Sequence, residues 1–507
     1  MKKFLFFILF IFSLLLVIII INTIRFKSKQ DGNIGVRRVF LIDSAAVKHL
    51  SSAIRFSSIS YDRNNDEITK ESKNQLELSA NKFIQKTETQ SSIFDSLHLF
   101  LRNTYPLIFK TLSSKIINNK SLLLQWKGSS KNKKPVILYA HLDVVPAYSE
   151  NDSSSWLHNP FAGDIDENYI YGRGAIDDKG SAIAIMESVE KLISANFIPS
   201  RDVFIAFGHD EEIGGNEGAK LIADELVKKG VHAEFLLDEG GLVAIDMVPF
   251  IKTPVALVFA SEKGYLTVHL TVKSNGGHSS FPPVDPPIEI LSKAIRNIHE
   301  HPFEKRISES VTEFMNYAGP EMKLPFKVLF ANRWLFCSFI LNEYEKIPSA
   351  NAMIRTTAVT TKISGGTKEN VIPSEVKATI NLRLLPGDRS EVILIKLNEI
   401  IDDARVILNI ENNSDEASEV SSINSEGFNL IKSTIKKVFP DVIVAPSLMI
   451  AQTDSRHFRK VTENIYRFLP VRMNNEILES IHGRDERIGI VDFMESIEFY
   501  KSLLVGL

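Results

Sequence analysis

Carboxylate and imidazole side chains recur in separate segments between His141 and His482, most of them after a short apolar run or in a glycine-rich turn. Two divalent ions about 3.5–4 Å apart can activate one water molecule and polarise the carbonyl group that it attacks. Such a centre requires a bridging carboxylate, two further ligands for each ion, and a base that binds neither ion. The residue types therefore predict a two-metal hydrolytic centre, with candidates in the segments HLDVVP, GRGAIDDKG, HDEEIGG, DEGG and IHGRDE.

The ligands of such a centre can be assigned from these segments. Asp177 lies in the glycine-rich segment, where the backbone can approach an ion closely, and suits the bridging role. His141 and Asp238 would complete the first ion site, and Glu212 and His482 would complete the second. Zinc accepts these nitrogen and oxygen ligands, and so do cobalt and manganese. We therefore expect two divalent metal ions, with zinc as the favoured metal.

The neighbouring Glu211 and Glu212 cannot both face one ion, because successive side chains at an extended strand end diverge. One of them can bind a metal ion while its neighbour accepts the proton of the attacking water. Asp143, two residues after His141, could accept the second N–H of that imidazole and so fix its tautomer. The other acidic and imidazole residues of these segments are interpreted as neighbours or supporting residues: Asp178, His209, Asp210 and Glu239.

Each segment has an ordinary structural explanation when it is taken alone. A His-X-Asp pair is commonly a turn or surface feature, and an acidic pair such as Glu211-Glu212 commonly begins a solvated helix. Asp177-Asp178 could cap a helix N-terminus, and His482 before a glycine could mark a helix end. The metal interpretation is favoured because the segments occur together, each at a strand end or in a glycine turn.

The order of helix-like and strand-like segments predicts an α/β fold. Within residues 43–260, helix-like SAIAIMESVEKLISAN is followed by strand-like VFIAFG, helix-like AKLIADELVKKG and strand-like AEFLL. This alternation predicts a three-layer catalytic domain with a largely parallel central sheet, and ligands of such sheets bind at the carboxyl ends of the strands. A smaller inserted α+β domain is expected over residues 261–414, and the catalytic domain resumes over residues 415–507.

The N-terminus carries an apolar run from Phe4 to Ile21 that one serine interrupts. As a helix this run is about 27 Å long, close to the thickness of the bilayer hydrocarbon. We expect a single-pass membrane anchor over residues 1–21, a tether over residues 22–42, and a catalytic domain on the non-cytoplasmic side. Basic residues flank both ends of the run, so the positive-inside rule does not select an orientation. A cleaved signal peptide, followed by secretion, is the alternative.

Composition narrows the remaining possibilities. The net charge of −3 offers no field that would attract nucleic acid. The single cysteine, Cys337, excludes an internal disulfide framework and a cysteine-rich zinc site, so any metal must be held by His, Asp and Glu. The segment FKVLFANRWLFCSFIL, within residues 302–349, is interpreted as a core or pocket-lining helix in preference to a second membrane span.

The segments HLDVVP, GRGAIDDKG, DEEIGG and LDEGG resemble those of the zinc-dependent peptidase and deacylase family that includes carboxypeptidase S, aminoacylase and glutamate carboxypeptidase. The resemblance covers residues 43–507 and points to the carboxypeptidase S branch, which also contains secreted enzymes that join or split fatty acids and amino acids. It implies Glu211 as the general base and Asp143 as the orienting carboxylate. It also implies a ligand set of His141, Asp177, Glu212, Asp238 and His482.

The same resemblance implies that the inserted domain is a lid and a homodimerisation domain. Its GGHS turn would supply the imidazole of His278 to the reacting carbonyl as an oxyanion donor. Asn370 and Arg383 match positions that hold the carbonyl or carboxylate of the substrate, and the planar fork of an arginine suits a carboxylate. A strand-end salt bridge is the alternative for Arg383. Asp454 and Arg456 lie in the segment TDSRH, which corresponds to a substrate-facing loop of the family.

We therefore expect a membrane-anchored dizinc hydrolase that cleaves an amide bond beside a free carboxylate, such as a C-terminal peptide bond. The alternative within the same class is a hydrolase or synthase of N-acyl amino acids. A catalytically silent scaffold that keeps metal ions for structure is the alternative from another class. The intact Glu211 argues against such a scaffold.

Overall fold

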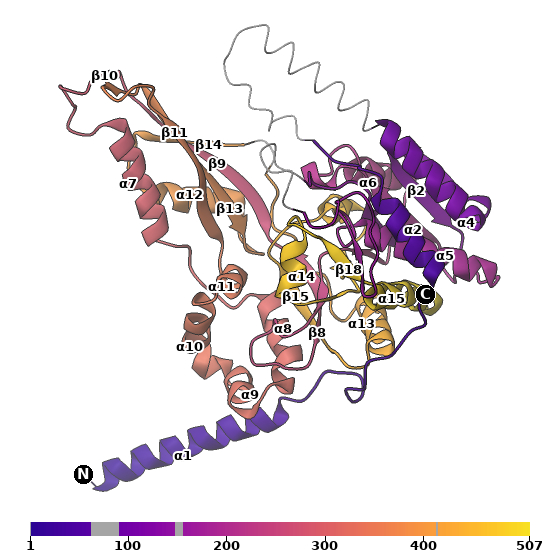
Figure 1. Cartoon of the computed structure of the whole chain (residues 1–507). Helices are drawn as coiled ribbons and strands as arrows, with labels where there is room; N and C mark the ends of the chain where they lie inside the picture. Colours follow the sequence, from indigo (N-terminus) through magenta and orange to yellow (C-terminus); the bar gives the residue numbers. More distant parts are fainter. Residues whose placement is uncertain (1, 62–90, 148–155, 412–413) are drawn as a thin grey trace. The chain divides into compact units, whose positions relative to one another are not determined.

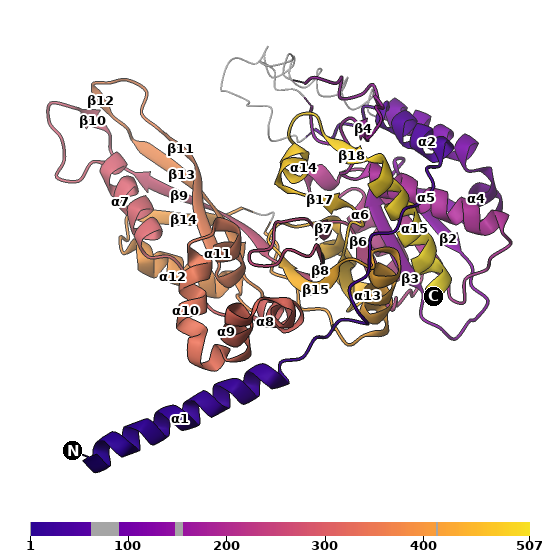
Figure 2. The same cartoon turned by 60° about the horizontal axis from the view of Figure 1, so that its bottom comes forward.

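The computed structural model describes residues 2–61, 91–147, 156–411 and 414–507. The chain divides into two compact units, whose elements are labelled in Figures 1 and 2. Unit 1 comprises residues 1–28, 260–420 and 446–452, and unit 2 comprises residues 29–259, 421–445 and 453–507. The domain boundaries drawn from the sequence stay predictions.

Unit 2 is built on a sheet whose middle strands are parallel. β3 lies between β5 and β6 and runs parallel to both, and β6 runs parallel to β16 on its other side. β2 and β1 continue the sheet beyond β5 in antiparallel order. This arrangement confirms the predicted α/β class with its largely parallel central sheet. The bounds are β1 (Ser113–Ile117), β2 (Ser121–Trp126), β3 (Val136–His141), β5 (Val203–Gly208), β6 (Phe235–Asp238) and β16 (Ile465–Arg467).

Helices cover both faces of this sheet. Ile137 and Tyr139 of β3 pack in one apolar cluster with Ile222 and Leu226 of α6. The alternate side chains of β3 point to the opposite face, because neighbouring residues of a strand alternate. On that face α5 packs against β3. α15 packs along α5, and α13 packs along α15. The bounds are α5 (Lys179–Ser194), α6 (Ala219–Lys228), α13 (Glu426–Val438) and α15 (Ile490–Gly506).

Unit 1 contains an antiparallel sheet in the order β11-β13-β9-β14, which α7 and α12 cover on one face. The cover is apolar: Leu291 and Ala294 of α7 and Leu397 of α12 pack in one buried cluster with Val268 and Ile380 of the sheet. The bounds are β9 (Gly264–Lys273), β11 (Thr357–Gly365), β13 (Glu375–Leu384), β14 (Val406–Ile410), α7 (Pro287–Glu300) and α12 (Ser390–Ile401).

The apolar segment expected to form a core helix is divided between α9 (Leu324–Ala331) and α10 (Arg333–Glu345), whose axes are bent by 115°. Asn332 occupies the break. α8 (Glu309–Ala318) precedes this helical elbow and α11 (Pro348–Ile354) follows it. The expectation of a core or pocket-lining helix is therefore replaced by a bent pair of helices, many of whose apolar side chains are exposed.

The N-terminal run forms α1 (Lys2–Arg25), which ends past the predicted limit at Ile21. Of the helices in the described residues, α1 is the one that is by itself long and apolar enough to cross a membrane, and none of its residues is buried. The expected tether packs along unit 2. The Gln30 side chain exchanges hydrogen bonds with the backbone of Val444 at 3.0 and 2.8 Å, and Arg37 forms an ion pair with Glu495 at 2.9 Å.

Candidate active site

Side chains from distant segments of unit 2 converge beyond the carboxyl end of β3. Nε2 of His141 lies 2.8 Å from Oδ1 of Asp177, and Nε2 of His482 lies 2.9 Å from Oδ2 of the same carboxylate. Oε2 of Glu212 lies 3.2 Å from Nε2 of His482. Each oxygen of Asp177 thus faces a different imidazole, which is the placement expected of a carboxylate shared by two cations.

Glu239 completes the His141 side of this cluster. Its Oε1 lies 3.4 Å from Nε2 of His141. Donor atoms of His141, Asp178 and Glu239 lie within 4.8 Å of one another, and the same limit holds for His141, Asp177 and Glu212. Glu239 and Asp178, which the sequence analysis left without a direct role, are therefore within reach of a cation.

The Asp238 carboxylate turns to other partners. It accepts hydrogen bonds from the backbone N–H groups of Glu239 at 2.9 Å and Ser455 at 3.1 Å. Asp238 shares a face of β6 with Leu236, which packs on the α6 side of the sheet. Because Glu239 is the next residue, its side chain leaves the strand end in a different direction. Asp238 as a metal ligand stays a prediction, and Glu239 is an additional donor that strand alternation could have indicated.

The donor set is suited to divalent cations. Oε1 of Glu212 is buried and has no hydrogen-bond partner among the described residues. A buried oxygen without a partner is costly unless a cation or a water molecule satisfies it. Burial, together with the nearby charge of Asp177, raises the pKa of Glu212 and of Glu239. Carboxylates gathered in this way repel one another, and bound cations would offset that repulsion.

Asp143 connects the His141 segment to the Glu211-Glu212 segment. Nδ1 of His141 lies 3.0 Å from the backbone carbonyl oxygen of Asp143 and 3.4 Å from its Oδ1. The two carboxylate oxygens accept hydrogen bonds at 3.2 Å from the backbone N–H groups of Glu211 and Glu212. Ser60 donates a further hydrogen bond at 2.7 Å. Although burial alone would raise the pKa of Asp143, the hydrogen bonds from His141 and Ser60 lower it. Asp143 therefore remains an anion that orients one imidazole and fixes both glutamates.

The two glutamates begin the short 3-10 helix η1 (Glu211–Ile213), directly after β5 and the residues His209 and Asp210. Burial, followed by the charges of Asp454 and Glu239, raises the pKa of Glu211 well above its ordinary value, although the positive charge of His141 opposes this. A carboxylate with a raised pKa is a stronger base. The geometry is thus compatible with one glutamate that binds metal and a neighbour that moves a proton.

Glu486 is a buried residue of the site region that the sequence analysis missed. Its Oε1 accepts hydrogen bonds from the backbone N–H groups of Ile176 at 2.9 Å and Asp177 at 3.1 Å. Its Oε2 accepts from the backbone of Gly174 at 3.0 Å and from Nη1 of Arg173 at 2.9 Å. One carboxylate thus satisfies four N–H donors of the GRGAIDD segment.

The same contacts join this segment to the turn that carries His482. Arg173 donates from Nη2 to the carbonyl oxygen of Gly483 at 2.9 Å, and the Gly172 N–H donates to the carbonyl oxygen of Glu486 at 2.8 Å. The signal available in the sequence was the acidic residue four positions after His482. In the sequence, Glu486 resembles a surface charge, because its partners belong to a remote segment and cannot be recognised from its neighbours.

The predicted residues of the lid lie in unit 1. His278 is exposed on the short strand β10 (Gly277–His278), which pairs with β12 (Val371–Ile372), and the Ser279 N–H donates to the carbonyl oxygen of Asn370 at 3.1 Å. The guanidinium of Arg383 lies 4.5 Å from the ring centre of Tyr265. The structure thus brings His278 and Asn370 to neighbouring positions. Their approach to the Asp177 cluster, and that of Arg383, stay predictions.

Asp454 and Arg456 lie in the short 3-10 helix η3 (Asp454–Lys460) of unit 2. Asp454 is fully buried and accepts a short hydrogen bond from the hydroxyl of Tyr139. Arg456 donates to the carbonyl oxygens of Thr453 and Gly214, both at 2.7 Å. These contacts hold η3 against the loop that follows η1. A role of Asp454 or Arg456 in substrate binding stays a prediction.

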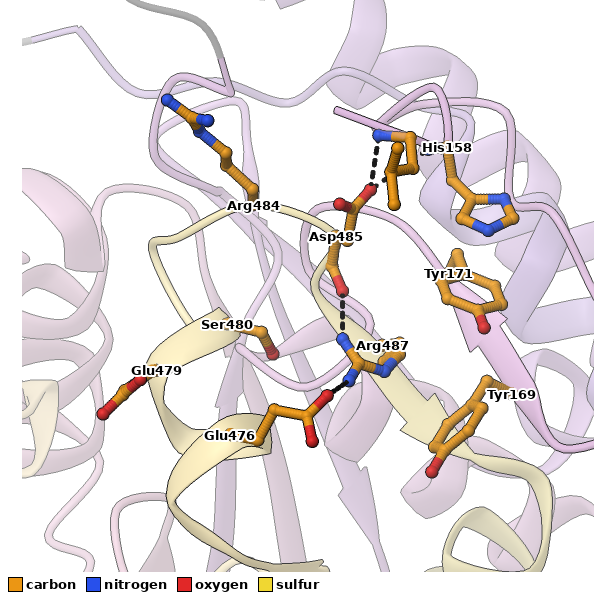
Figure 3. A pocket seen from close by; sticks show the side chains of 10 residues that line it. His158, Tyr169, Tyr171, Glu476, Glu479, Ser480, Arg484, Asp485 and Arg487 are labelled. Carbon is orange, nitrogen blue, oxygen red and sulfur yellow. Dashed lines mark hydrogen bonds and ion pairs between the residues drawn. The ribbon is translucent and has the colours of Figure 1, made fainter. Parts of the chain in front are cut away.

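A polar pocket of about 600 Å³ borders the turn that carries His482 (Figure 3). Its lining includes Tyr171, whose ring stacks on His158 with centroids 3.8 Å apart, and Arg487, which forms an ion pair with Glu476. The Asp485 carboxylate accepts a hydrogen bond from the backbone N–H of His158 at 3.1 Å. The pocket contains none of the candidate metal ligands, so its walls support the His482 turn from the outside.

Comparison with known proteins decides the family. A sequence profile of the peptidase family M20/M25/M40 matches residues 137–505. The chain belongs to this family. The expected family is thereby confirmed, and so is the expectation of an enzyme: the chain is a hydrolase of the metallopeptidase and amidohydrolase type. Its similarity to carboxypeptidase S-like proteins and to N-fatty-acyl-amino acid synthase/hydrolases confirms the expected carboxypeptidase S branch.

Curated relatives include a probable carboxypeptidase S-like 2 of Dictyostelium discoideum, which is 39% identical over 97% of this chain and 91% of that protein. The N-fatty-acyl-amino acid synthase/hydrolase PM20D1 of Xenopus tropicalis is 36% identical over 80% of this chain and 79% of its own length. Solved structures with the same fold include the M20 family metallo-carboxypeptidase Sso-CP2 of Sulfolobus solfataricus. It has a TM-score of 0.62 and 18% identity, and the match covers 90% of this chain and 98% of that one.

Proposed function

We propose that this chain is a dizinc hydrolase that cleaves the amide bond beside a free carboxylate, as in a C-terminal peptide bond. The observation that carries the proposal is the position of Asp177, whose two oxygens lie 2.8 and 2.9 Å from the imidazoles of His141 and His482. The family membership and the carboxypeptidase S-like relative support the reaction class.

The proposed roles follow from the contacts around Asp177. His141, Asp177, Glu212 and His482 would hold two zinc ions, with Asp238 or Glu239 completing the His141 side. Zinc bound there would polarise the scissile carbonyl and acidify the attacking water. Glu211 accepts the proton of that water and returns it to the leaving amine. The Asp143 carboxylate would keep Glu211 in place by accepting a hydrogen bond from the Glu211 backbone N–H, and Asp143 would orient the His141 ring through its carbonyl oxygen and its carboxylate.

The inserted domain would complete the site from unit 1. His278 would donate a hydrogen bond to the developing oxyanion, and Arg383 would bind the free carboxylate of the substrate through its planar fork. Asn370 would contact the substrate carbonyl. Closure of this domain as a lid would exclude water and assemble the donors around the substrate. The same domain would form a homodimer, as the family resemblance implies.

The N-terminal helix supports a membrane location. α1 has the length and apolar composition of a single membrane span, and we propose that it anchors the enzyme with unit 2 on the non-cytoplasmic side. Cleavage of α1 as a signal sequence, followed by secretion, is the alternative. N-terminal sequencing of the chain recovered from the membrane fraction and from the medium separates the two, because an anchored chain keeps residues 1–21 and a secreted chain begins after them.

A second candidate activity is the hydrolysis or synthesis of N-acyl amino acids. The observation in its favour is the similarity to the N-fatty-acyl-amino acid synthase/hydrolases, at 36% identity for the relative from Xenopus tropicalis. Both candidate reactions cleave an amide beside a carboxylate, so the same residues would serve either one. The difference lies in the group on the far side of the amide, a peptide in one case and a fatty acyl chain in the other.

A substrate panel on the full chain in detergent tests the proposal. The panel compares a blocked dipeptide with a free C-terminus, the same dipeptide as its C-terminal amide, and a long-chain N-acyl amino acid, each with and without chelator. We expect turnover of the free acid, little turnover of the amide and loss of turnover with chelator. Equal turnover of acid and amide would contradict the carboxylate requirement. Preference for the acyl amino acid would select the second candidate activity.

A further inference from the structure

A buried polar residue fixes the end of α1 to the helical elbow of unit 1. Asn332, at the break between α9 and α10, is fully buried. Its Nδ2 donates to the carbonyl oxygen of Ile19 at 3.3 Å and to Oγ1 of Thr23 at 3.2 Å, and its Oδ1 accepts from Nδ2 of Asn22 at 3.0 Å. These hydrogen bonds join Asn332 to particular residues of α1, and so they fix the position along α1 at which the elbow lies.

Packing beside Asn332 supports the same placement. The ring of Phe26 lies against Gly319, where an added Cβ would come within 2.8 Å of the ring and within 2.9 Å of Phe330. A side chain at position 319 would therefore displace Phe26. The hydrogen bonds of the last turns of α1 and the packing of Phe26, the residue after α1, together place the end of this helix beside the elbow.

The depth of this contact in a bilayer follows from the length of the apolar run. If the run from Phe4 to Ile21 spans the hydrocarbon, Ile19 lies about 3 Å from its end at the helical rise per residue. The elbow is hydrogen-bonded to Ile19 and Thr23, and so it lies at the boundary between hydrocarbon and headgroups. A surface at this depth meets lipid on any side that protein does not cover.

The elbow has the composition of a segment that rests on lipid. Residues 323–341 contain three basic residues among their apolar side chains, and the acidic residues Glu343 and Glu345 follow only in the last turn of α10. Trp334 is 57% exposed and Phe339 50% exposed, and Leu324 and Leu335 are also exposed. Tryptophan is enriched at membrane–water interfaces, and basic residues favour anionic headgroups. An exposed apolar surface of this kind marks an interaction site.

We propose that α9 and α10 form a second membrane contact, which lies in the headgroup region of the bilayer beside α1 and holds unit 1 against the lipid surface. The inference rests on the proposed membrane anchor, because the bilayer is placed by α1. The occupant of the surface is lipid, because the surface adjoins the helix that enters the membrane and its exposed side chains include Trp334, Leu335 and Phe339. A fatty acyl amino acid dissolved in the same bilayer would then lie close to the inserted domain.

Quenching of tryptophan fluorescence by brominated lipid tests the proposal. The full chain is reconstituted into vesicles of phosphatidylcholine and phosphatidylserine whose acyl chains carry bromine close to the headgroup, and flotation confirms insertion. The chain has three tryptophans, and Trp126 is only 3% exposed. We expect brominated lipid to quench the wild-type chain and to lose most of that effect in Trp334→Phe, a substitution that keeps the apolar surface.

A second variant separates the elbow from the anchor. Asn332→Leu removes the hydrogen bonds to α1, so we expect the chain still to float with vesicles while the quenching of Trp334 decreases. If wild type and Trp334→Phe float with the vesicles and are quenched equally, the elbow contact is wrong and the anchor is still supported. The same conclusion follows if a second copy of the chain covers Trp334. A chain that does not float would overturn the anchor, and the elbow contact with it.

Discussion

The carboxylate of Glu486 accepts a hydrogen bond at 3.1 Å from the backbone N–H of Asp177, the residue that lies between the two candidate metal-binding imidazoles. Glu486 also follows His482 by four residues and is joined to its turn through Arg173 and Gly483. The buried carboxylate of Glu486 therefore positions two candidate ligands, Asp177 and His482, that come from different parts of the chain.

Glu486→Gln is expected to weaken metal binding. The amide group would direct N–H donors at backbone N–H groups and would remove the negative charge that pairs with Arg173. Loss of a residue that supports metal ligands typically lowers metal affinity by about 10–100-fold, and a competing chromophoric chelator measures this change. The matched control is Glu476→Gln, which removes an exposed ion pair with Arg487. Equal metal affinity in Glu486→Gln and wild type would contradict the positioning role.

Glu211→Gln is expected to abolish proton transfer while metal binding persists. The substitution keeps the shape of the side chain and the backbone hydrogen bond to Asp143, but an amide cannot accept the proton of the attacking water. General-base catalysis contributes about 10²–10⁴-fold to rate, so kcat should fall by a factor in that range. Metal content, measured by elemental analysis, should stay the same. Unchanged kcat would exclude Glu211 as the base. The control is Glu225→Gln on α6, which removes an ion pair with Lys115 and leaves the candidate site intact.

The fold and the position of the site follow from sequence periodicity, because strand-like runs end at His141 and at Asp238 and parallel strands share one carboxyl edge. The contributions of Glu239 and Glu486 to the site do not follow from sequence periodicity. Whether Asp238 or Glu239 faces His141 depends on the direction in which β6 ends, and the partners of Glu486 are backbone groups more than 300 residues away in the chain. The contact of Asn332 with α1 was also hidden, because its partners Ile19 and Thr23 lie more than 300 residues away in the chain.

Removal of metal ions is expected to destabilise unit 2 as well as stop turnover. Without cations, the buried carboxylates of Asp177, Glu212 and Glu239 lose their compensating charge, and burial already raises the pKa of Glu212 and of Glu239. A ligand present at 100 times its Kd stabilises a folded protein by about 2.7 kcal/mol. Thermal unfolding before and after dialysis against chelator should therefore show a lower Tm, which added zinc restores. An unchanged Tm would mean that the cluster binds no metal in the folded chain.

Lys263 provides a test of the interior of unit 1 through pH. Its ammonium is buried and donates to the carbonyl oxygens of Ala352 and Arg355, both at 2.8 Å, and burial lowers its pKa to about 7. The unfolded chain keeps the ordinary lysine pKa, so above pH 7 it binds a proton that the folded chain has released. The free energy of unfolding therefore rises with pH across this window.

Lys263→Met removes this dependence while keeping an apolar stem of similar length. The destabilisation relative to wild type should be larger at pH 9 than at pH 7, by on the order of 2 kcal/mol, since one unit of pKa corresponds to about 1.4 kcal/mol. Denaturant unfolding of both proteins at the two pH values measures the difference. Lys273→Met, at an exposed position on β9, should show no such growth. A pH-independent difference for Lys263→Met would mean that Lys263 is charged in the folded protein.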